Sequence, residues 1–469
     1  MSKQSKYKNL SMNTLLFTIS SFGAKIISFL LVPIYTSVLS TKDYGNVDLV
    51  STTVQLLIPI ATLNIQDAVL RFSLDDKYEA EEVIGAGMKL ILGSSSVLGV
   101  ILLIVSHYRL INIDKDYLLF LFFSFFFGVI NNCFSMYLKA KNKVKILTVS
   151  GLVNTFITCF LNILLLVVIR LGVTGYLISN VVGTWIAITI MFFWGNIYKE
   201  SKMSGSTKLL KAMILYSLPL VMNALAWWLN NASDRYILTF FCGTAINGIY
   251  AVSYKIPTIL STIQTIFYNA WSISAITEFD KDDRDGFIGN IYTIYSGISF
   301  IACSVIIMCN IFLARILYAK VFFDAWKFVP VLLTGTVFNG IALFEGCIFT
   351  AVKKTREVSN TTLVGAAINT VLNLLLIPFI GALGAAIATM VGYAIIWIVR
   401  TKRMLKIVAI KVNWSKQLTM MIALIVQSIV ASSGKNFYIQ VICMVVIIYK
   451  QKDIVKKIFN RLVKKESIK

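Results

Sequence analysis

The sequence predicts an all-α polytopic membrane protein with about 14 transmembrane helices. Apolar residues make up 57% of the 469 residues and charged residues only 14%, whereas soluble domains carry about 25% charged residues. Apolar runs of about 20 residues, the length of a helix that crosses a bilayer, recur from end to end. The longest connections, 267–286 and 400–417, leave no room for an extramembrane catalytic domain, so we expect a protein that is not an enzyme.

We expect each apolar run to form one membrane-spanning helix, including the first. A secretory signal has an apolar region of about 7 to 15 residues and a small-residue cleavage site, whereas the first run is longer and lacks that site. The last two runs are short. In chain order the expected spans are 11–39, 45–72, 84–106, 117–137, 146–169, 173–195, 212–230, 237–266, 287–313, 329–351, 362–380, 383–399, 418–430 and 437–449.

The basic residues predict the orientation of these spans. Lys and Arg concentrate in the cytoplasmic loops of multi-pass proteins, and a cytoplasmic N-terminus puts 32 of the 44 Lys and Arg residues on that side. We therefore expect a protein of the cytoplasmic membrane with both termini in the cytoplasm. The net charge is +22, and the basic C-terminal tail that contributes to it is expected to face the headgroups of anionic membrane lipid. We expect no nucleic acid partner.

The cysteine and histidine residues do not predict a metal centre. All seven cysteines lie in apolar spans, and His107, at the outer end of the third span, is the single histidine of the sequence. Their spacing is not that of a metal site or of a disulfide framework. We expect no metal, no disulfide and no cofactor.

Two pairs of segments show internal repetition. Residues 151–183 resemble 362–392, and residues 44–53 resemble 247–256 more loosely. The aligned positions are Asn162 with Asn373, Gly172 with Gly381, Gly175 with Gly384, and Gly45 with Gly248.

This repetition predicts two lobes of six helices each. Six spans separate the partners in both pairs, and an even number gives the halves the same orientation, related by an axis along the membrane normal. We expect an N-lobe over 1–200 and a C-lobe over 201–405 around a central cleft. Residues 406–469 then form two C-terminal helices and a basic cytoplasmic tail.

Two long stretches resemble a known family. They are "NTLLFTISSFGAKIISFLLVPIYTSVLSTKDYG" (13–45) and "SLPLVMNALAWWLNNASDRYILTFFCGTAINGIYAVSYKIP" (217–257). They resemble Wzx-type polysaccharide flippases of the multidrug/oligosaccharidyl-lipid/polysaccharide exporter (MOP) superfamily, over nearly the whole chain. The resemblance implies alternating-access translocation of an undecaprenyl-diphosphate-linked oligosaccharide to the outer leaflet, for capsule, exopolysaccharide or another envelope glycan. It also suggests a glycan polymerase and glycosyltransferases as partners.

Two lysines near the middle of their spans are the first candidate substrate-binding residues. Lys25 lies in the first span and Lys255 at a similar depth in the eighth. A charge at the bilayer centre costs about 2.5 to 3.5 kcal/mol, so such residues usually face a bundle interior or a water-filled cavity. One lysine comes from each lobe. If both face the cleft, they form a cationic centre for a diphosphate, with each lysine acting as a point charge.

Two further pairs of charged residues lie near the ends of their spans. Arg71 is expected at the cytoplasmic mouth as a first substrate contact, and the alternative is an ion pair with Asp67, four residues before it. Asp234 and Arg235 are candidates for gating or release at the outer end of the seventh span. A solvated interfacial pair is the alternative for them.

Acidic residues within the spans are candidates for coupling transport to a cation. They are Asp48, Asp67 and Glu345, because burial favours the protonated form of a carboxylate and so permits a proton or sodium site. The alternative for Glu345 is an ion pair with a base on a neighbouring helix. The third span also carries Lys89, to which the sequence assigns no role.

Three other functions compete with the polysaccharide flippase. A multidrug/cation antiporter of the same superfamily needs acidic groups for cationic drugs, so the two central lysines count against it. A peptidoglycan-precursor flippase also needs a cationic cavity, and charge does not separate it. An envelope-glycan polymerase or glycosyltransferase needs a large outer catalytic loop, and the sequence contains none.

Overall fold

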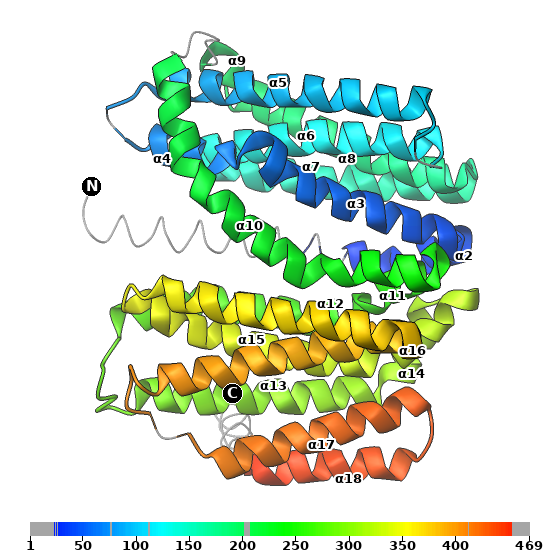
Figure 1. The fold of residues 1–469 in the computed structure, drawn as a ribbon, viewed down its shortest axis with the longest axis vertical. Helices are drawn as coiled ribbons and strands as arrows, with labels where there is room; N and C mark the ends of the chain where they lie inside the picture. The colour runs from blue at the N-terminus through cyan, green and yellow to red at the C-terminus, as the bar shows by residue number, and fades with distance from the viewer. Residues whose placement is uncertain are drawn as a thin grey trace, which may run out of the picture. The chain divides into compact units, whose positions relative to one another are not determined.

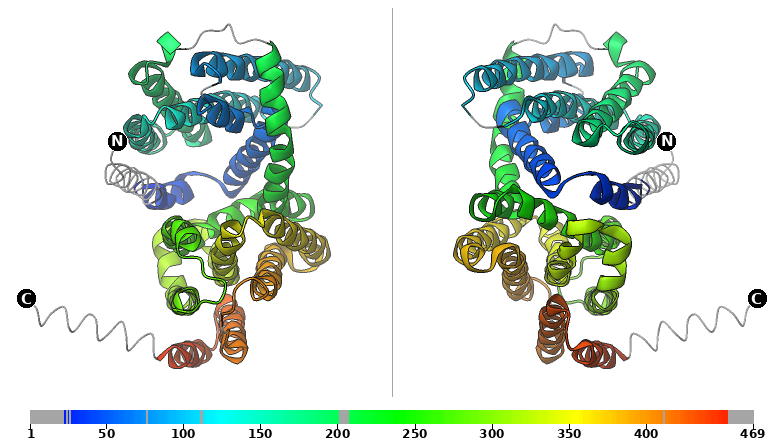
Figure 2. Two further views of the ribbon diagram at one scale, coloured as in Figure 1. Left: turned by 90° about the vertical axis from the view of Figure 1, so that its left-hand side faces the viewer. Right: turned by 90° about the vertical axis from the view of Figure 1, so that its right-hand side faces the viewer.

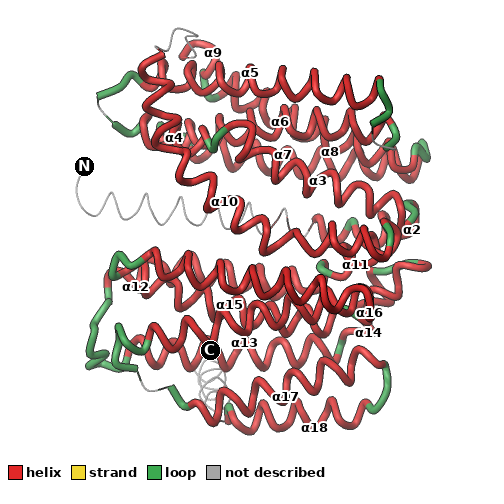
Figure 3. Tube along the Cα trace, viewed as in Figure 1, coloured by secondary structure: helices red, strands yellow, loops and turns green. Residues whose placement is uncertain are grey.

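The computed structural model describes Gly23, Lys25 and residues 27–75, 77–110, 113–200, 207–410 and 412–452. These residues form helices and connecting loops, with no strand in the described ranges (Figures 1 and 3). Residues 11–22 of the expected first span, and the basic tail from residue 453, lie outside them. The chain divides into two compact units, 1–228 and 229–469.

The first unit is organised around α6 (Lys115–Ala140). Its core includes Phe125, Cys133 and Tyr137, which are fully buried. The helices packed against α6 are α3 (Thr41–Thr62), α4 (Ile65–Ser73), α5 (Ala80–His107), α7 (Val144–Asn162) and α8 (Gly172–Trp194). The unit also contains α2 (Val32–Val38), the π-helix η1 (Ile163–Val168), the short α9 (Ile197–Glu200) and most of α10 (Thr207–Cys242).

A sharp bend divides the expected second span into α3 and α4. The two helices meet at 57°, because Leu63 and Asn64 between them both adopt the left-handed region, with φ of 50° and 52°. Asparagine tolerates this region better than most residues. The bend places the charged residues of α4 on a short separate helix at the end of the span.

The second unit is organised around α15 (Val329–Ala351), which is buried along most of its length. Its neighbours are α12 (Lys255–Thr277), α13 (Phe287–Met308), α16 (Thr355–Met404) and α17 (Trp414–Ser433). The remaining elements are α11 (Thr244–Ser253), α14 (Asn310–Leu317), the 3-10 helix η2 (Lys320–Lys327) and α18 (Phe437–Lys450). The last two helices, α17 and α18, lie side by side (Figure 2).

Many described helices are long and apolar enough to cross a membrane. There are nine such helices in the described ranges, or ten if the bent α3–α4 pair is one span. Two shorter apolar helices, Ile27–Val38 and Phe437–Lys450, add to them. The element α16 counts once although it contains two helices joined at Gly381. The polytopic all-α fold is confirmed, whereas the count of fourteen and the lobe boundaries at 200 and 405 stay predictions.

One expected boundary is wrong. The sequence places a break between spans at 231–236, but α10 continues through these residues to Cys242. The chain turns instead at Gly243, whose φ of 84° is accessible to glycine at little cost. The polar string at 233–235 resembles a loop, but Asp234 is buried within the helix.

The repeated segments adopt corresponding backbone conformations in the two units. Gly172, the first residue of α8, has φ of 59°, and its counterpart Gly381 within α16 has φ of 57°. After each turn the helix passes close to the preceding one. A Cβ on Gly175 would lie 3.2 Å from the carbonyl oxygen of Leu165, and one on Gly384 would lie 2.8 Å from that of Leu376. Each repeat is therefore a tight helical hairpin.

A second contact along each hairpin also corresponds. A Cβ on Gly183 would lie 3.2 Å from the carbonyl oxygen of Asn154, and one on Gly392 would lie 3.2 Å from that of Gly365. Glycine at these positions allows the paired helices to approach closely. The repeat predicted from the sequence thus corresponds to one hairpin geometry in each unit.

Candidate functional site

The two central lysines lie in different units. Lys25 is helical and exposed, and the residues on either side of it, 24 and 26, lie outside the described ranges. Lys255 is half-buried and begins α12 directly after the helix break at Tyr254. The Lys255 ammonium forms no ion pair or hydrogen bond with another described residue. The shared cationic centre of Lys25 and Lys255 stays a prediction.

The charged residues Asp67 and Arg71 of α4 interact with different partners. Arg71 is exposed and pairs with Asp75, at 3.8 Å between Nη1 and Oδ2. Asp67 is half-buried and interacts electrostatically with Lys139 of α6. The alternative of an Asp67–Arg71 ion pair is therefore wrong, because each of the two residues interacts with a different partner. The role of Arg71 as a first substrate contact stays a prediction. The third candidate in this unit, Asp48, is half-buried on α3.

Asp234 lies in a buried hydrogen-bond network of the second unit. The Tyr250 and Tyr254 hydroxyls lie 2.8 and 3.2 Å from its Oδ2, and the backbone N–H of Arg235 donates to Oδ1 at 2.9 Å. The guanidinium of Arg235 lies over the Tyr254 ring, 5.4 Å from its centroid. Asp234 is only 3% exposed, so the alternative of a solvated interfacial pair is wrong for it.

Arg400 is a buried cation that the sequence analysis missed. It lies on α16 and is 2% exposed. It packs beside Gly346 of α15, where a Cβ would make an ordinary contact of 3.5 Å with Nη1. Its hydrogen bonds, between 2.7 and 3.1 Å, go to the carbonyl oxygens of Ala342 and Val358 and to the hydroxyls of Thr361 and Thr362. The sequence analysis ended the span at residue 399 and so placed Arg400 in a connecting segment, where a buried side chain is not expected.

Glu345 lies next to this arginine and is fully buried on α15. Its Oε1 lies 2.5 Å from the hydroxyl oxygen of Thr401. Arg400 acts on Glu345 electrostatically, but no nitrogen of the guanidinium is among its ion-pair partners in the described ranges. The alternative of a direct ion pair is therefore wrong, whereas the coupling role stays a prediction.

A polar pocket within the first unit was also missed. It lies between α6, α7 and α8, has a volume of about 220 Å³, and includes three amide or ammonium side chains in its wall. Asn131 and Lys139 come from α6 and Asn154 from α7. The signal was present in the sequence, because Asn131, Ser135 and Lys139 are spaced four residues apart and so share one helix face.

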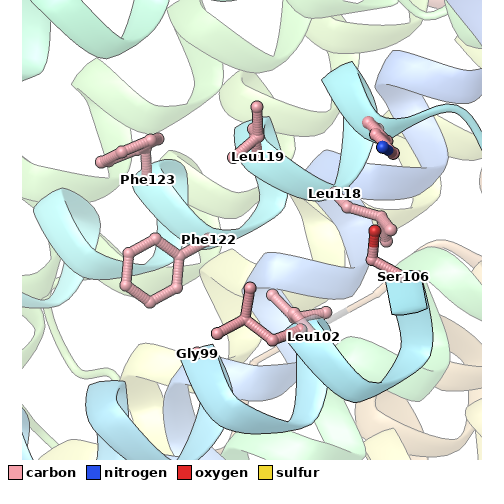
Figure 4. A pocket seen from close by; sticks show the side chains of 9 residues that line it. Gly99, Leu102, Ser106, Leu118, Leu119, Phe122 and Phe123 are labelled. Carbon is pink, nitrogen blue, oxygen red and sulfur yellow. The ribbon is translucent and has the colours of Figure 1, made fainter.

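An apolar groove of the same unit has the opposite chemistry. It lies between α5 and α6, has a volume of about 330 Å³, and is lined mostly by leucine and phenylalanine (Figure 4). Gly99 admits the ring of Phe122, which a Cβ there would approach to 3.1 Å. Such a surface is typical of a face that contacts lipid chains.

Comparison with known proteins places this chain in a family. The family model described as "polysaccharide biosynthesis protein" matches residues 10–272. The chain belongs to the polysaccharide biosynthesis protein family. The matched segment contains the whole first unit from residue 10 and includes Lys25, Arg71, Asp234 and Lys255. No curated protein matches the chain.

Solved structures with a similar fold identify the fold of this chain. The chain is similar to lipid II flippase MurJ in an inward closed conformation, with a TM-score of 0.71 and 12% identity over 96% of this chain and 100% of that one. It is also similar to an inward-facing multidrug resistance MATE transporter of the MOP superfamily, with a TM-score of 0.65 and 14% identity over 82% and 95%. An outward-facing MATE structure gives a TM-score of 0.60 at 14% identity over 85% and 96%.

These comparisons and the apolar helices establish a multi-pass membrane protein with the fold of MurJ and of MATE transporters. The expected polysaccharide family and the expected fold are confirmed. The fold is that of membrane transporters.

Proposed function

We propose that this protein translocates an undecaprenyl-diphosphate-linked oligosaccharide across the cytoplasmic membrane. Membership of the polysaccharide biosynthesis family, over residues 10–272, carries this proposal. The MOP fold supports transport as the activity. Lys255 supports an anionic substrate, because a half-buried ammonium at a helix break, with no ion-pair partner among the described residues, attracts a diphosphate.

The mechanism we propose is alternating access of the two lobes around a central cleft. The inward-open cleft takes the diphosphate-sugar headgroup onto Arg71, Lys25 and Lys255, while the polyprenyl tail stays in lipid. The lobes then rock, and the headgroup leaves on the outer side, with Asp234 and Arg235 acting in gating or release. No covalent bond forms or breaks, so the protein needs no catalytic residue or cofactor.

Cation coupling is assigned to Asp48, Asp67 and Glu345. Glu345 is the best supported of the three because it is fully buried and hydrogen-bonded to a hydroxyl. In this proposal both termini face the cytoplasm. A glycan polymerase and glycosyltransferases act on the same lipid-linked glycan before and after translocation.

A peptidoglycan-precursor flippase is the second candidate. The similarity to MurJ, which covers 96% of this chain, favours it, although an identity of 12% reports the fold alone. The cationic drug antiporter has less support, since its substrates are repelled by the lysines that attract a diphosphate.

Headgroup translocation in proteoliposomes tests the proposal. The substrates are undecaprenyl-diphosphate oligosaccharide, a peptidoglycan lipid precursor and a fluorescent organic cation. We expect the wild type to move the oligosaccharide lipid, and the Lys25→Ala, Lys255→Ala double variant to lose most of this activity. The Lys435→Ala protein, which removes an exposed lysine from the α17–α18 loop, serves as the matched control. Preference for the peptidoglycan precursor or the organic cation overturns the substrate assignment.

A further inference from the structure

The polar pocket of the first unit contains groups that are costly to place in a membrane protein. Its wall consists of Asn131, Ser135 and Lys139 from α6, Leu147, Ser150, Gly151 and Asn154 from α7, and Ala187 from α8. Polar side chains at membrane depth usually face a bundle interior or a water-filled cavity and mark substrate pathways. Gly151 and Ala187 are small, so their positions leave space between the helices. The pocket therefore has both polar groups and room for a ligand.

Two amide side chains of the pocket have donors or acceptors that bond no described residue. The amide of Asn131 makes no hydrogen bond to another described residue. The amide oxygen of Asn154 lies 3.2 Å from the Thr158 hydroxyl, but its amide nitrogen donates to no described residue. Both amides are half-buried, and an amide loses free energy where it gives up water without gaining another partner. A bound ligand or water molecules can therefore bond these two amides.

The charged residue in the pocket wall is Lys139, which has an acidic neighbour on another helix. Lys139 lies on the last turn of α6, beside the loop 141–143, and Asp67 of α4 interacts with it electrostatically. Asn131 lies two helical turns deeper, about 12 Å along the axis. The pocket thus leads from a lysine near the helix end to uncharged amides within the lobe. An anion bound at the lysine places any attached hydroxyl groups against the amides.

We propose that this pocket binds a phosphate together with the hydroxyl groups of an attached sugar, from the headgroup of the translocated glycolipid. Amides and serine hydroxyls both donate and accept hydrogen bonds, as recognition of sugar hydroxyls requires, and a lysine ammonium attracts phosphate. At about 220 Å³ the pocket is smaller than the roughly 300 Å³ lower bound for drug-sized ligands. It therefore takes one sugar phosphate rather than a whole oligosaccharide.

This inference rests on the proposed function, because it assigns the pocket to the substrate of transport. It adds a binding site away from the central lysines. Under the predicted orientation, the α6–α7 loop faces the cytoplasm, where the headgroup is loaded. The pocket then holds a headgroup before the cleft receives it.

Binding of radiolabelled glucose 1-phosphate to the full-length protein in phosphatidylcholine nanodiscs tests the site. We expect saturable binding to the wild type. Lys139→Gln should weaken it about tenfold, the usual effect of losing a charge-assisted hydrogen bond. Asn131→Leu should weaken it about fivefold, because it removes neutral hydrogen bonds to the sugar. Lys139→Gln changes an exposed side chain, so it tests the site without risk to the core. Asn180→Leu is the matched control, because it removes a half-buried α8 amide that bonds the Tyr176 carbonyl outside the pocket.

Two further arms separate the possible outcomes. Nanodiscs that contain phosphatidylglycerol should bind glucose 1-phosphate equally well; displacement by this lipid, or equal binding by the wild type and both pocket variants, overturns the inference. Glycolipid translocation is measured on the same preparations. Translocation without glucose 1-phosphate binding overturns the pocket assignment alone, whereas binding without translocation of the oligosaccharide lipid overturns the proposed function.

Discussion

The hydroxyl oxygen of Thr401 lies 2.5 Å from the carboxyl oxygen Oε1 of Glu345. The same hydroxyl oxygen lies 2.9 Å from the carbonyl oxygen of Trp397. A hydroxyl carries a single proton, so it donates to only one of these two acceptors. Both contacts become hydrogen bonds when Glu345 is protonated and donates to Thr401, which then donates to Trp397. A neutral Glu345 thus satisfies both contacts at once, whereas an ionised Glu345 competes with the Trp397 carbonyl for the hydroxyl proton.

Glu345→Gln should preserve this arrangement, because the amide nitrogen donates to Thr401 as a protonated carboxyl does. We expect its free energy of unfolding to stay within about 1 kcal/mol of the wild type, whereas Glu345→Ala should lose about 3 kcal/mol by opening a cavity and removing the hydrogen bond. Thermal unfolding of the purified protein measures both effects. If Glu345 couples transport to protons, Glu345→Gln also makes translocation independent of a pH gradient. Gradient-dependent translocation by this variant excludes the coupling role.

Replacing Arg400 should destabilise the second unit strongly. Its planar guanidinium reaches carbonyl oxygens and threonine hydroxyls of two helices, and a lysine has neither the donors nor the geometry to replace it. We expect Arg400→Lys to cost about 3 kcal/mol, because buried acceptors lose their partners. Lys402→Ala, which removes an exposed cation two residues away, is the control. Equal melting temperatures of the two variants contradict a structural role for Arg400.

The hairpin glycines should differ in their sensitivity to alanine. Gly381 has a positive φ but space around it, since a Cβ would come no closer than 3.8 Å to Cys242. Gly384→Ala would bring a Cβ to 2.8 Å from backbone atoms of Leu376, which cannot move aside as a flexible side chain can. We expect about 1 to 2 kcal/mol of strain for Gly381→Ala and a larger loss for Gly384→Ala. Denaturation curves that rank the variants in the opposite order contradict this geometry.

Glu200 should make the stability of the first unit depend on pH. Partial burial favours the neutral acid, but hydrogen bonds from Tyr137 at 2.7 Å and Lys143 at 3.2 Å outweigh it. The pKa of Glu200 therefore lies below its ordinary value of 4.5. A carboxyl with a lowered pKa contributes stability above its ordinary value and loses it as the pH falls through the lowered one.

Glu200→Gln should remove this dependence. We expect a loss of about 1 kcal/mol at pH 7 that diminishes toward pH 3. Melting temperatures of the wild type and Glu200→Gln, measured as a function of pH, check the effect. A difference that grows on acidification contradicts the assigned sign.

Apolar composition and periodic runs were sufficient to predict the helical class, because a backbone in hydrocarbon must satisfy its own hydrogen bonds. The repeat was also readable, because Gly172 and Gly381 must both adopt a positive φ. The helix boundary at Gly243 could not be predicted, because the polar string that contains the buried Asp234 has the composition of a loop. Arg400 was missed because its burial depends on contacts between segments distant in the sequence. The four-residue spacing of the Asn131 face was present in the sequence, but that spacing does not tell which helices enclose the face.

The paired glycines Gly183 and Gly392 suggest a history for the chain. In a duplicated hairpin, the glycine at the close helix–helix contact was kept while the residues around it changed. Asn154 and Thr158 approach Gly183 in the first copy. Their counterparts Gly365 and Asn369 approach Gly392 in the second copy. The second copy thus lacks the side-chain amide that Asn154 contributes to the polar pocket. Ancestral symmetry in the backbone therefore allows one copy to acquire recognition chemistry that the other does not share.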